Sequence, residues 1–306
     1  MIAVFGANPA WQKTVYYEKF TPGEVNRAIK MDAFASGKGV NFCRALHCAQ
    51  LGEAHLFQFA DGDNGKKHQN FLEREKIRHT SIATGFETRI CSTCIDLATG
   101  SATELIEPSF PADETACAAM VSAWASALPD CQGCAITGSL PDKTDPALYG
   151  KIIREALMRR LPLLIDAVSG IDAALQKSDR FILKINASEL KKLMHQDETV
   201  PALKSAAAKW MNAVLAITDG SNNAMLAAGG KFYTYSLPEI KVVNPIGSGD
   251  TASAVLLGNL LSGMDAPSAF GRALAAASAN CLDPMPGHFN PVTAEKLLPE
   301  TELFTP

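Results

Sequence analysis

The sequence has no surplus of basic residues and no long apolar segment. Lys and Arg number 28 against 32 Asp and Glu, whereas a protein held to nucleic acid by phosphate contacts usually carries a strong positive balance. The longest uncharged run, residues 115–129, has the composition of a packed helix and is shorter than the about 20 apolar residues that cross a bilayer. The N-terminus also lacks a basic leader. We therefore expect a globular, cytoplasmic protein that binds neither nucleic acid nor a membrane.

Cysteine is present, but its spacing does not favour a metal centre. Cys91 and Cys94, and Cys131 and Cys134, form two Cys-x-x-Cys pairs, a spacing that zinc sites use. The first pair lies in a β-branched run that predicts a strand, where residues three apart point to opposite faces. Buried free thiols in a reducing compartment are therefore favoured over a zinc or redox site.

The middle and C-terminal parts of the chain alternate short apolar runs with helical patterns. Such alternation predicts an α/β fold, in which helices cover both faces of a mostly parallel central sheet. Ligands of such sheets bind beyond the carboxyl ends of the strands, so the residues that follow each strand are candidates for chemistry. Strands are expected at residues 133–137, 161–166, 180–185 and 214–218, and helices at 145–160, 188–194 and 200–211.

Two stretches, residues 14–34 and 88–107, break this alternation. Each contains alternating polar and apolar residues without an intervening helix, and the second has a turn at 98–101. They are expected to form antiparallel strands. The pattern leaves two arrangements open, a small sheet that stands off the main domain as a lid and an extension of the edge of the main sheet.

The strongest local motif is a glycine-rich turn between an apolar strand and a helix. Gly247, Ser248 and Gly249 precede Asp250 at the expected start of the helix. Glycines allow close backbone approach, and the first helical turn offers unpaired N–H groups at the positive end of the helix dipole, so this turn is suited to a transferring phosphoryl group. Asp250 could accept the proton of an attacking hydroxyl, although an Asp that caps the helix is the simpler alternative.

Two other nucleotide motifs are weak or absent. Gly247, Gly249 and Ala252 fit the loose dinucleotide fingerprint, but no second strand follows the helix as that motif requires. The chain contains no Walker A sequence. Dinucleotide-binding and P-loop folds are therefore disfavoured.

A second glycine-containing turn precedes an earlier helix. Gly37, Lys38 and Asn41 lie close together here, where the lysine supplies positive charge and the amide can pair with sugar hydroxyls. A solvated surface turn is the alternative.

Further polar residues follow the other expected strands. Arg89 could make a bidentate phosphate contact, and Asn186 and Glu189 could organise a hydrated Mg²⁺ ion. A solvated arginine and a helix-capping pair explain the same residues equally well. Together these residues predict that the ligands bind along one edge of the sheet. The remaining candidates at this edge are Ser139, Lys184, Thr218, Asp219 and Gly220.

In this order the motifs resemble the ribokinase-like carbohydrate kinases of the PfkB family. The two signatures are the segments 37–41 and 247–250, and the resemblance extends over nearly the whole chain. It implies a three-layer α/β/α sandwich in one kinase domain, residues 1–306, with a small β-sheet lid inserted at about 12–35 and 86–107. It also implies ATP and Mg²⁺ as cofactors and a homodimer joined through the lid.

The resemblance implies roles for the matching residues. Asp250 would be the general base, and Gly247, Ser248 and Gly249 would form the anion hole. Glu189 and Asn186 would hold Mg²⁺ through water. The residues implied for the nucleotide are Lys184, Asn186, Thr218, Asp219, Gly220 and Asn280, and those implied for the sugar phosphate are Gln12, Gly37, Lys38, Asn41, Arg89 and Ser139.

The motifs are most similar to the branch of the family that acts on phosphorylated ketohexoses. The implied reaction is the ATP-dependent phosphorylation of tagatose 6-phosphate or fructose 1-phosphate to the bisphosphate. Gln12 departs from the family pattern, which has Asp at the sugar hydroxyls, and Ser36 replaces a glycine. These departures leave open a kinase for another sugar or sugar phosphate, such as fructose 6-phosphate, and a non-catalytic sugar-phosphate sensor.

Overall fold

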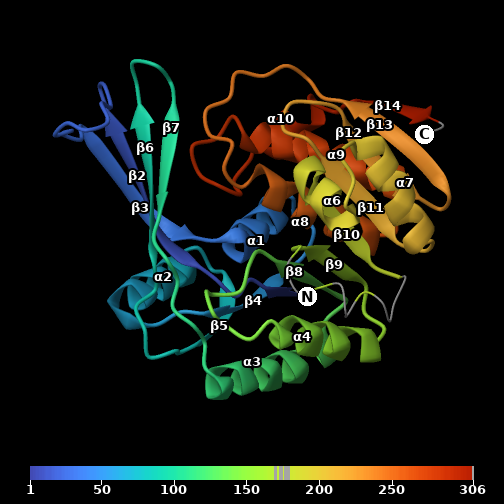
Figure 1. Cartoon of the computed structure of the whole chain (residues 1–306), viewed down its shortest axis with the longest axis horizontal. Coiled ribbons are helices and arrows are strands. Elements are labelled where there is room, and N and C mark those ends of the chain that lie inside the picture. Colours follow the sequence, from blue (N-terminus) through green and yellow to red (C-terminus); the bar gives the residue numbers. More distant parts are fainter. Residues whose placement is uncertain (169–170, 172–174, 176–179, 305–306) are drawn as a thin grey trace.

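The computed structural model describes residues 1–168, 171, 175 and 180–304, and its larger sheet is ten-stranded in this part of the chain (Figure 1). In spatial order its strands are β14 (Glu300–Phe304), β13 (Lys231–Ser236), β12 (Ala224–Ala228), β11 (Val214–Thr218), β10 (Ile182–Asn186), β9 (Leu163–Asp166), β8 (Gly133–Thr137), β1 (Ile2–Phe5), β4 (Ala54–Phe59) and β5 (Arg78–Ile82). The strands from β11 to β5 pair in parallel, and β12 to β14 add an antiparallel edge.

Helices cover both faces of this sheet and give the predicted three-layer α/β/α sandwich. One face packs against α3 (Glu114–Ala127), α4 (Ala147–Met158), α6 (Ala187–Met194) and α7 (Thr199–Lys209). The other face packs against α1 (Lys38–Cys48), α8 (Ser248–Leu261), α9 (Ala266–Asn280) and α10 (Pro291–Glu295), with a contribution from α2 (Gly62–Arg74). Because both faces are covered, strands such as β1 and β9 are apolar and buried along their length.

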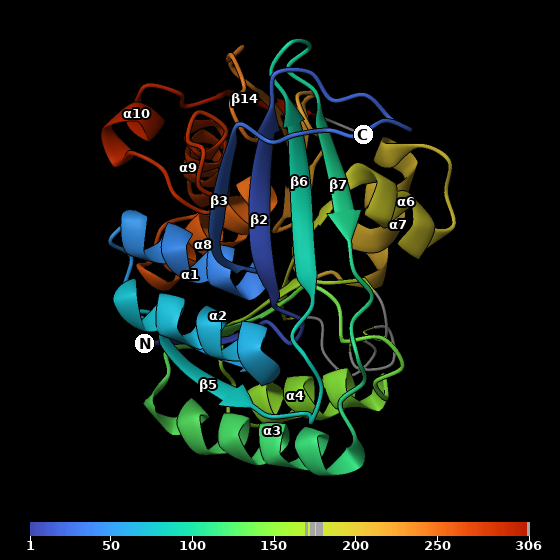
Figure 2. The ribbon, with the colours of Figure 1, turned by 90° about the vertical axis from the view of Figure 1, so that its left-hand side faces the viewer.

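A separate four-stranded sheet stands off the larger one (Figure 1), and its face is seen in Figure 2. Its strands, in order, are β3 (Lys30–Ser36), β2 (Ala10–Tyr17), β6 (Ile90–Asp96) and β7 (Ala102–Ile106); we call it the small sheet. Its separation favours the first of the two predicted arrangements over an edge extension. The expectation of purely antiparallel strands is wrong for the central pair, since β2 and β6 are parallel. Both strands leave the same carboxyl edge of the larger sheet, after β1 and β5, and therefore run in the same direction.

The predicted boundaries agree closely with the observed elements. The strands expected at 133–137 and 214–218 coincide with β8 and β11, and the other expected helices and strands of the larger domain differ at their ends by one or two residues. The uncharged run at 115–129 lies largely in α3. Within the described ranges, no helix is both long and apolar enough to span a bilayer.

The two Cys-x-x-Cys pairs lie in different parts of the fold. Cys91 and Cys94 are on β6 of the small sheet, whereas Cys134 is on β8 of the larger one. The cysteines are free thiols. Among the residues that the structure describes, no group of three or more His, Cys, Asp or Glu side chains is placed to share a metal ion.

Candidate active site

The carboxyl ends of several parallel strands meet the N-termini of α1 and α8 at one edge of the larger sheet. Ser139 follows β8, Asp166 ends β9 and Lys184 lies on β10. Asp166 bonds to Lys38 at the start of α1 and to Ser253 in α8. The structure therefore brings residues from widely separated parts of the sequence into one site, as the strand-end pattern predicts.

Asp250 lies in the first turn of α8, and only 6% of it is exposed. Nδ2 of Asn41, on α1, donates a hydrogen bond of 2.8 Å to Oδ2 of Asp250. Burial raises the pKa of Asp250 to about 6; the positive charge of Lys38 opposes this rise and the negative charge of Asp166 adds to it. The carboxylate is therefore charged at neutral pH and basic enough to act as an effective general base.

The turn that leads into α8 is open to an anion. Gly247 caps the helix with a φ of 84°, and a Cβ there would lie 2.7 Å from the backbone nitrogen of Gly287, so this position requires glycine. No hydrogen bond of the described residues uses the backbone N–H of Gly249 or Asp250. Nζ of Lys184 lies 2.9 Å from the point that a Cβ would occupy at Gly249. The predicted anion hole thus has free donors and an adjacent positive charge.

A buried carboxylate that the sequence analysis missed, Asp166, organises the charges of the site. It accepts hydrogen bonds from Nζ of Lys38 at 3.0 Å, from Nζ of Lys184 at 3.4 Å and from Oγ of Ser253 at 2.7 Å. Burial opposes its charge, but the two ammonium groups and the hydroxyl hold the pKa of Asp166 below its ordinary value. One signal points to it in the sequence, a charged residue that ends an otherwise apolar strand.

Several residues predicted for the sugar phosphate lie near Asp250. Gly37 caps α1 and Lys38 begins it, so both stand one turn before Asn41. Oδ1 of Asn41 is buried and has no hydrogen-bond partner among the described residues, so it is available to accept from a ligand hydroxyl. Ser139 is exposed and accepts a hydrogen bond of 3.3 Å from Nδ2 of Asn8, a residue to which the sequence assigned no role in the site.

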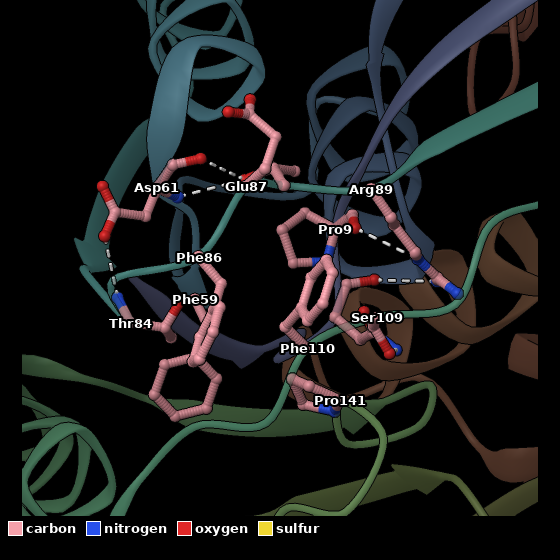
Figure 3. Close-up of a pocket in the computed structure, with 12 residues that line it drawn as sticks. Pro9, Phe59, Asp61, Thr84, Phe86, Glu87, Arg89, Ser109, Phe110 and Pro141 are labelled. Carbon is pink, nitrogen blue, oxygen red and sulfur yellow. Dashed lines mark hydrogen bonds between the residues drawn. The ribbon is translucent and has the colours of Figure 1, made fainter.

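Arg89 lies beside Pro9, with its guanidinium directed toward the backbone of that segment (Figure 3). Its Nη2 and Nε donate to the backbone carbonyls of Asn8 and Pro9 at 3.3 and 3.4 Å. It lines a cavity of about 20 Å³, which has room for about one water molecule. Phe86 and Phe110, which line the same cavity, stack with their ring centroids 5.2 Å apart. Within the described part of the chain, the guanidinium is thus held by backbone oxygens and by no acidic side chain.

Gln12, which stands where the family pattern has Asp, is buried in the small sheet and 7% exposed. Its Nε2 donates to Oγ1 of Thr93 on the neighbouring strand β6 at 2.9 Å, and to the carbonyl of Lys13 at 3.3 Å. The orientation of this amide is therefore set by Thr93.

A cavity of about 520 Å³ adjoins the anion hole. Thr218 and Gly220, both predicted for the nucleotide, line it together with Ser248 and Gly249. Asp219 does not; its Oδ2 accepts a hydrogen bond from Asn222 in the same turn. The walls are otherwise mostly apolar and include Leu237, Pro238, Ile240, Val242, Pro245, Ala252, Leu274, Ala277 and Cys281. An apolar cavity of this size beside an anion hole fits a nucleotide.

Asn280, which is predicted to lie beside the nucleotide, does not line this cavity. Asn280 is fully buried. Its Nδ2 donates to the backbone carbonyls of His288 at 2.9 Å and Met285 at 3.3 Å. It therefore supports the turn after α9, and its neighbours Ser278 and Cys281 line the cavity instead.

Asn186 and Glu189 form a capping box at the start of α6. Oδ1 of Asn186 accepts from the N–H of Glu189 and Oε2 of Glu189 accepts from the N–H of Asn186, both at 2.9 Å. The helix-capping alternative is thus present. Asn186 is exposed and Glu189 half-buried, so their oxygens remain accessible to a hydrated ion, and the Mg²⁺ role stays a prediction.

Comparison with known proteins agrees with this geometry. Residues 2–292 match the pfkB family of carbohydrate kinases. Among solved structures, Escherichia coli phosphofructokinase-2 superposes with a TM-score of 0.88 at 18% identity over 97% of both chains. A Thermotoga maritima protein described as a possible 1-phosphofructokinase gives 0.86 at 16% over 100% of both chains, and a candidate phosphofructokinase from Staphylococcus aureus gives 0.81 at 23% over 99% of both. These structures share the fold, and the family match covers most of the sequence. The chain therefore belongs to the pfkB family of carbohydrate kinases and is a sugar kinase, a phosphotransferase.

Proposed function

We propose that the protein transfers the γ-phosphate of ATP to a hydroxymethyl group of a ketohexose phosphate and so forms the bisphosphate. The observation that carries this proposal is the position of Asp250. It is a buried carboxylate with a pKa of about 6, directly beside the unpaired N–H groups of Gly249 and Asp250. A hydroxyl next to this carboxylate and a phosphoryl group at the N-terminus of α8 would therefore be adjacent.

In the proposed reaction Asp250 accepts the proton of the attacking hydroxyl, and the hydrogen bond from Asn41 orients its carboxylate. The backbone N–H groups at the start of α8 stabilise the negative charge of the transferring group, and Lys184 adds a positive charge. Phosphoryl transfer passes through a loose transition state, so positioning and charge neutralisation contribute more than base strength. Asp166 supports both by fixing Lys38 and Lys184.

The proposed cofactors are ATP and Mg²⁺. The cavity of about 520 Å³ next to the anion hole suits a nucleotide, with Thr218 and Gly220 in its lining. Glu189 and Asn186 would hold Mg²⁺ through water, because carboxylate and amide oxygens suit this ion. The bound ion would supply positive charge to the phosphates.

The proposed acceptor is a phosphorylated sugar, because Arg89 and Lys38, two of the residues predicted for the sugar phosphate, carry positive charge that could bind its phosphate. The sequence motifs favour tagatose 6-phosphate or fructose 1-phosphate. Fructose 6-phosphate is a second candidate, since E. coli phosphofructokinase-2, which shares the fold, has been solved in complex with it. Gln12 bears on this choice, as an amide lacks the strong acceptor pair of a carboxylate.

We further propose a cytoplasmic homodimer joined through the small sheet. Met31 and Leu105 are each 55% exposed on this sheet, and the strand register places both on the same face. Exposed apolar side chains that share a face favour burial against a partner. A tetrameric form is known for E. coli phosphofructokinase-2.

The decisive experiment is a coupled assay of ADP release with ATP and Mg²⁺. The acceptors are tagatose 6-phosphate, fructose 1-phosphate, fructose 6-phosphate and the corresponding free ketohexoses. We expect one ketohexose phosphate to give the highest kcat/KM and Asp250→Asn to remove most of that rate. Tight binding of a sugar phosphate without ADP release from any acceptor would contradict the proposal and favour a non-catalytic sensor.

A further inference from the structure

Arg44 is buried on α1, yet it has no role in the proposed chemistry. Only 5% of its side chain is exposed. Its guanidinium forms a fork with the carboxylate of Glu75, at the end of α2, with Nε–O distances of 3.0 Å and an Nη2–Oε2 distance of 2.8 Å. The rings of Phe34 and Phe71 lie 5.9 and 6.0 Å from its Cζ. Fork geometry and flanking rings hold this guanidinium rigidly.

The same guanidinium also binds two backbone carbonyls from distant segments. Nη2 donates to the carbonyl of Ala35 at 2.6 Å, and Nη1 donates to the carbonyl of Pro286 at 3.4 Å. Ala35 lies near the end of β3 of the small sheet, just before the sugar-side turn at Gly37 and Lys38. Pro286 belongs to the turn that follows α9. The Arg44 side chain therefore links the end of β3 in the small sheet to the turn that follows α9.

The turn at Pro286 and Gly287 lies against Asn41, which is predicted for the sugar phosphate, and against Gly247, the cap of α8. A Cβ on Gly287 would overlap the backbone of Asn41. A Cβ on Gly247, the cap of α8, would lie 2.7 Å from the nitrogen of Gly287 and 3.1 Å from Cα of Pro286. Gly247 and Gly287 therefore have no room for a side chain, and the atoms that would block one belong mainly to the backbone of the neighbouring segment. A displacement of Pro286 would therefore reach both Asn41 and the N-terminus of α8.

We infer that Arg44 is a positioning residue that couples the small sheet to the anion hole. The planar guanidinium of Arg44 binds the carbonyls of both Ala35 and Pro286. It thereby fixes the distance between the turn at Gly37 and Lys38 and the cap of α8. The inference rests on the proposed kinase function, in which a hydroxyl on one side attacks a phosphoryl group on the other. It adds a residue that touches neither substrate.

Stability alone would not require this arrangement. Replacing a buried ion pair with apolar side chains of similar volume often leaves stability unchanged or raised. Removing Arg44 alone would nevertheless destabilise the protein, because the charge of Glu75 would remain without its partner. A useful variant must therefore keep a positive charge beside Glu75 or remove both charges.

Arg44→Lys is the first test. Its ammonium can pair with Glu75, but a single point charge on a flexible stem cannot also hold Ala35 and Pro286 in fixed positions. With the best acceptor of the panel, we expect a urea midpoint close to that of the wild type and a kcat lower by about 10- to 100-fold, the scale of a small misplacement of reacting groups. The KM for ATP is expected to change much less, because Arg44 does not touch the nucleotide cavity.

Arg44→Met combined with Glu75→Met is the second test. Compared with Arg44→Met alone, the double variant is expected to regain most of the urea midpoint but not the kcat. Arg74→Met is the matched control, because Arg74 is an exposed arginine next to Glu75 on the same helix. It is expected to behave as the wild type in both measurements.

A wild-type kcat in Arg44→Lys, or a kcat that recovers with the urea midpoint in the double variant, would overturn the inference and leave Arg44 with a structural role. A wild-type protein that releases no ADP with any acceptor would contradict the proposed function, and the inference with it. Failure of the inference and failure of the proposed function are distinguishable, because the proposed function is tested on the wild-type protein alone.

Discussion

Nδ2 of Asn41 donates a hydrogen bond of 2.8 Å to Oδ2 of Asp250, which lies 209 positions further along the chain. Asn41 is in the first turns of α1 and Asp250 in the first turn of α8, so the bond joins the two helix starts that follow glycine-containing turns. Burial raises the pKa of Asp250 to about 6, and the bond from Asn41 opposes this rise. The balance of these effects sets the pH range in which Asp250 can accept a proton.

The pH dependence of kcat/KM tests this balance. Asp250 must be deprotonated to act as a base, so kcat/KM is expected to be constant well above pH 6 and to fall by about tenfold per pH unit well below it. Asn41→Ala removes a bond that lowers the pKa, so the acid limb is expected to move to higher pH. Profiles of both proteins, from about pH 5 to about pH 8, provide the comparison. An acid limb at the same pH in the variant would show that the bond does not tune Asp250.

Asp250→Asn separates catalysis from folding. The amide cannot take a proton, so kcat is expected to fall by about 100- to 10,000-fold. The pKa of about 6 in the folded protein lies above the ordinary value of 3.8, so ionised Asp250 costs stability above pH 6 and none below the ordinary value. At neutral pH the variant is therefore expected to have a Tm equal to or above that of the wild type. A near wild-type kcat would exclude Asp250 as the base, and a lower Tm would attribute the lost activity to a damaged fold.

Asp166→Asn is expected to destabilise the protein as well as inactivate it. The change leaves the ammonium groups of Lys38 and Lys184 without their shared carboxylate, and breaking a buried ion pair from one side costs about 3–5 kcal/mol. Because the pKa of Asp166 is lowered in the folded protein, its stabilising effect is present above its ordinary value and lost as the pH falls through the lowered one.

Urea unfolding of Asp166→Asn and the wild type at neutral and acidic pH provides the measurement. The difference in unfolding free energy is expected to narrow in acid. Asp63→Asn is the control, because Asp63 is an exposed aspartate whose Lys66 pair is also exposed, and its effect is expected to stay within about 0.5 kcal/mol. Equal losses in the two variants would contradict a special role for the buried carboxylate.

The parts of the site that depend on consecutive residues could be predicted from the sequence. A glycine before a helix and an aspartate in its first turn form a local pattern, so Gly247 and Asp250 were identified correctly as neighbours at the start of a helix. Asp166 was missed because its importance comes from Lys38 and Lys184, which belong to other elements. Its position at the end of an apolar strand was visible, but its partners were not.

The side-chain contacts of Asn280 and the direction of the β2–β6 pairing also depend on distant parts of the chain. Asn280 lies on the helix α9 close to the proposed nucleotide cavity, yet its side chain binds the backbone carbonyls of Met285 and His288. The helical pattern of the sequence does not predict these contacts. The parallel pairing of β2 with β6 joins segments that are separated in the chain by three strands and two helices, in the order β3, α1, β4, α2, β5. Pairing between such distant segments depends on the tertiary fold rather than on alternation within each strand.

Introducing positive charge on the exposed apolar face of the small sheet tests the proposed dimer. Met31 and Leu105 lie on that face, on β3 and β7, and both are 55% exposed. If two copies bury these faces against each other, Met31→Lys combined with Leu105→Lys places ammonium groups in an apolar interface, where they lose hydration without gaining a partner. Light scattering after size exclusion is expected to give twice the chain mass of 32.6 kDa for the wild type and the mass of one chain for the variant.

Met211→Lys is the matched control for this experiment, because Met211 is 74% exposed but lies after α7 on the larger domain. It makes one substitution of the same kind, at a methionine that is more exposed than Met31, and is expected to leave the dimer intact. A wild-type mass of one chain, or a dimer that persists in the double variant, would contradict association through this face. Dissociation by Met211→Lys as well would assign the contact to another surface, because the two substitutions share their chemistry and differ in their place on the molecule.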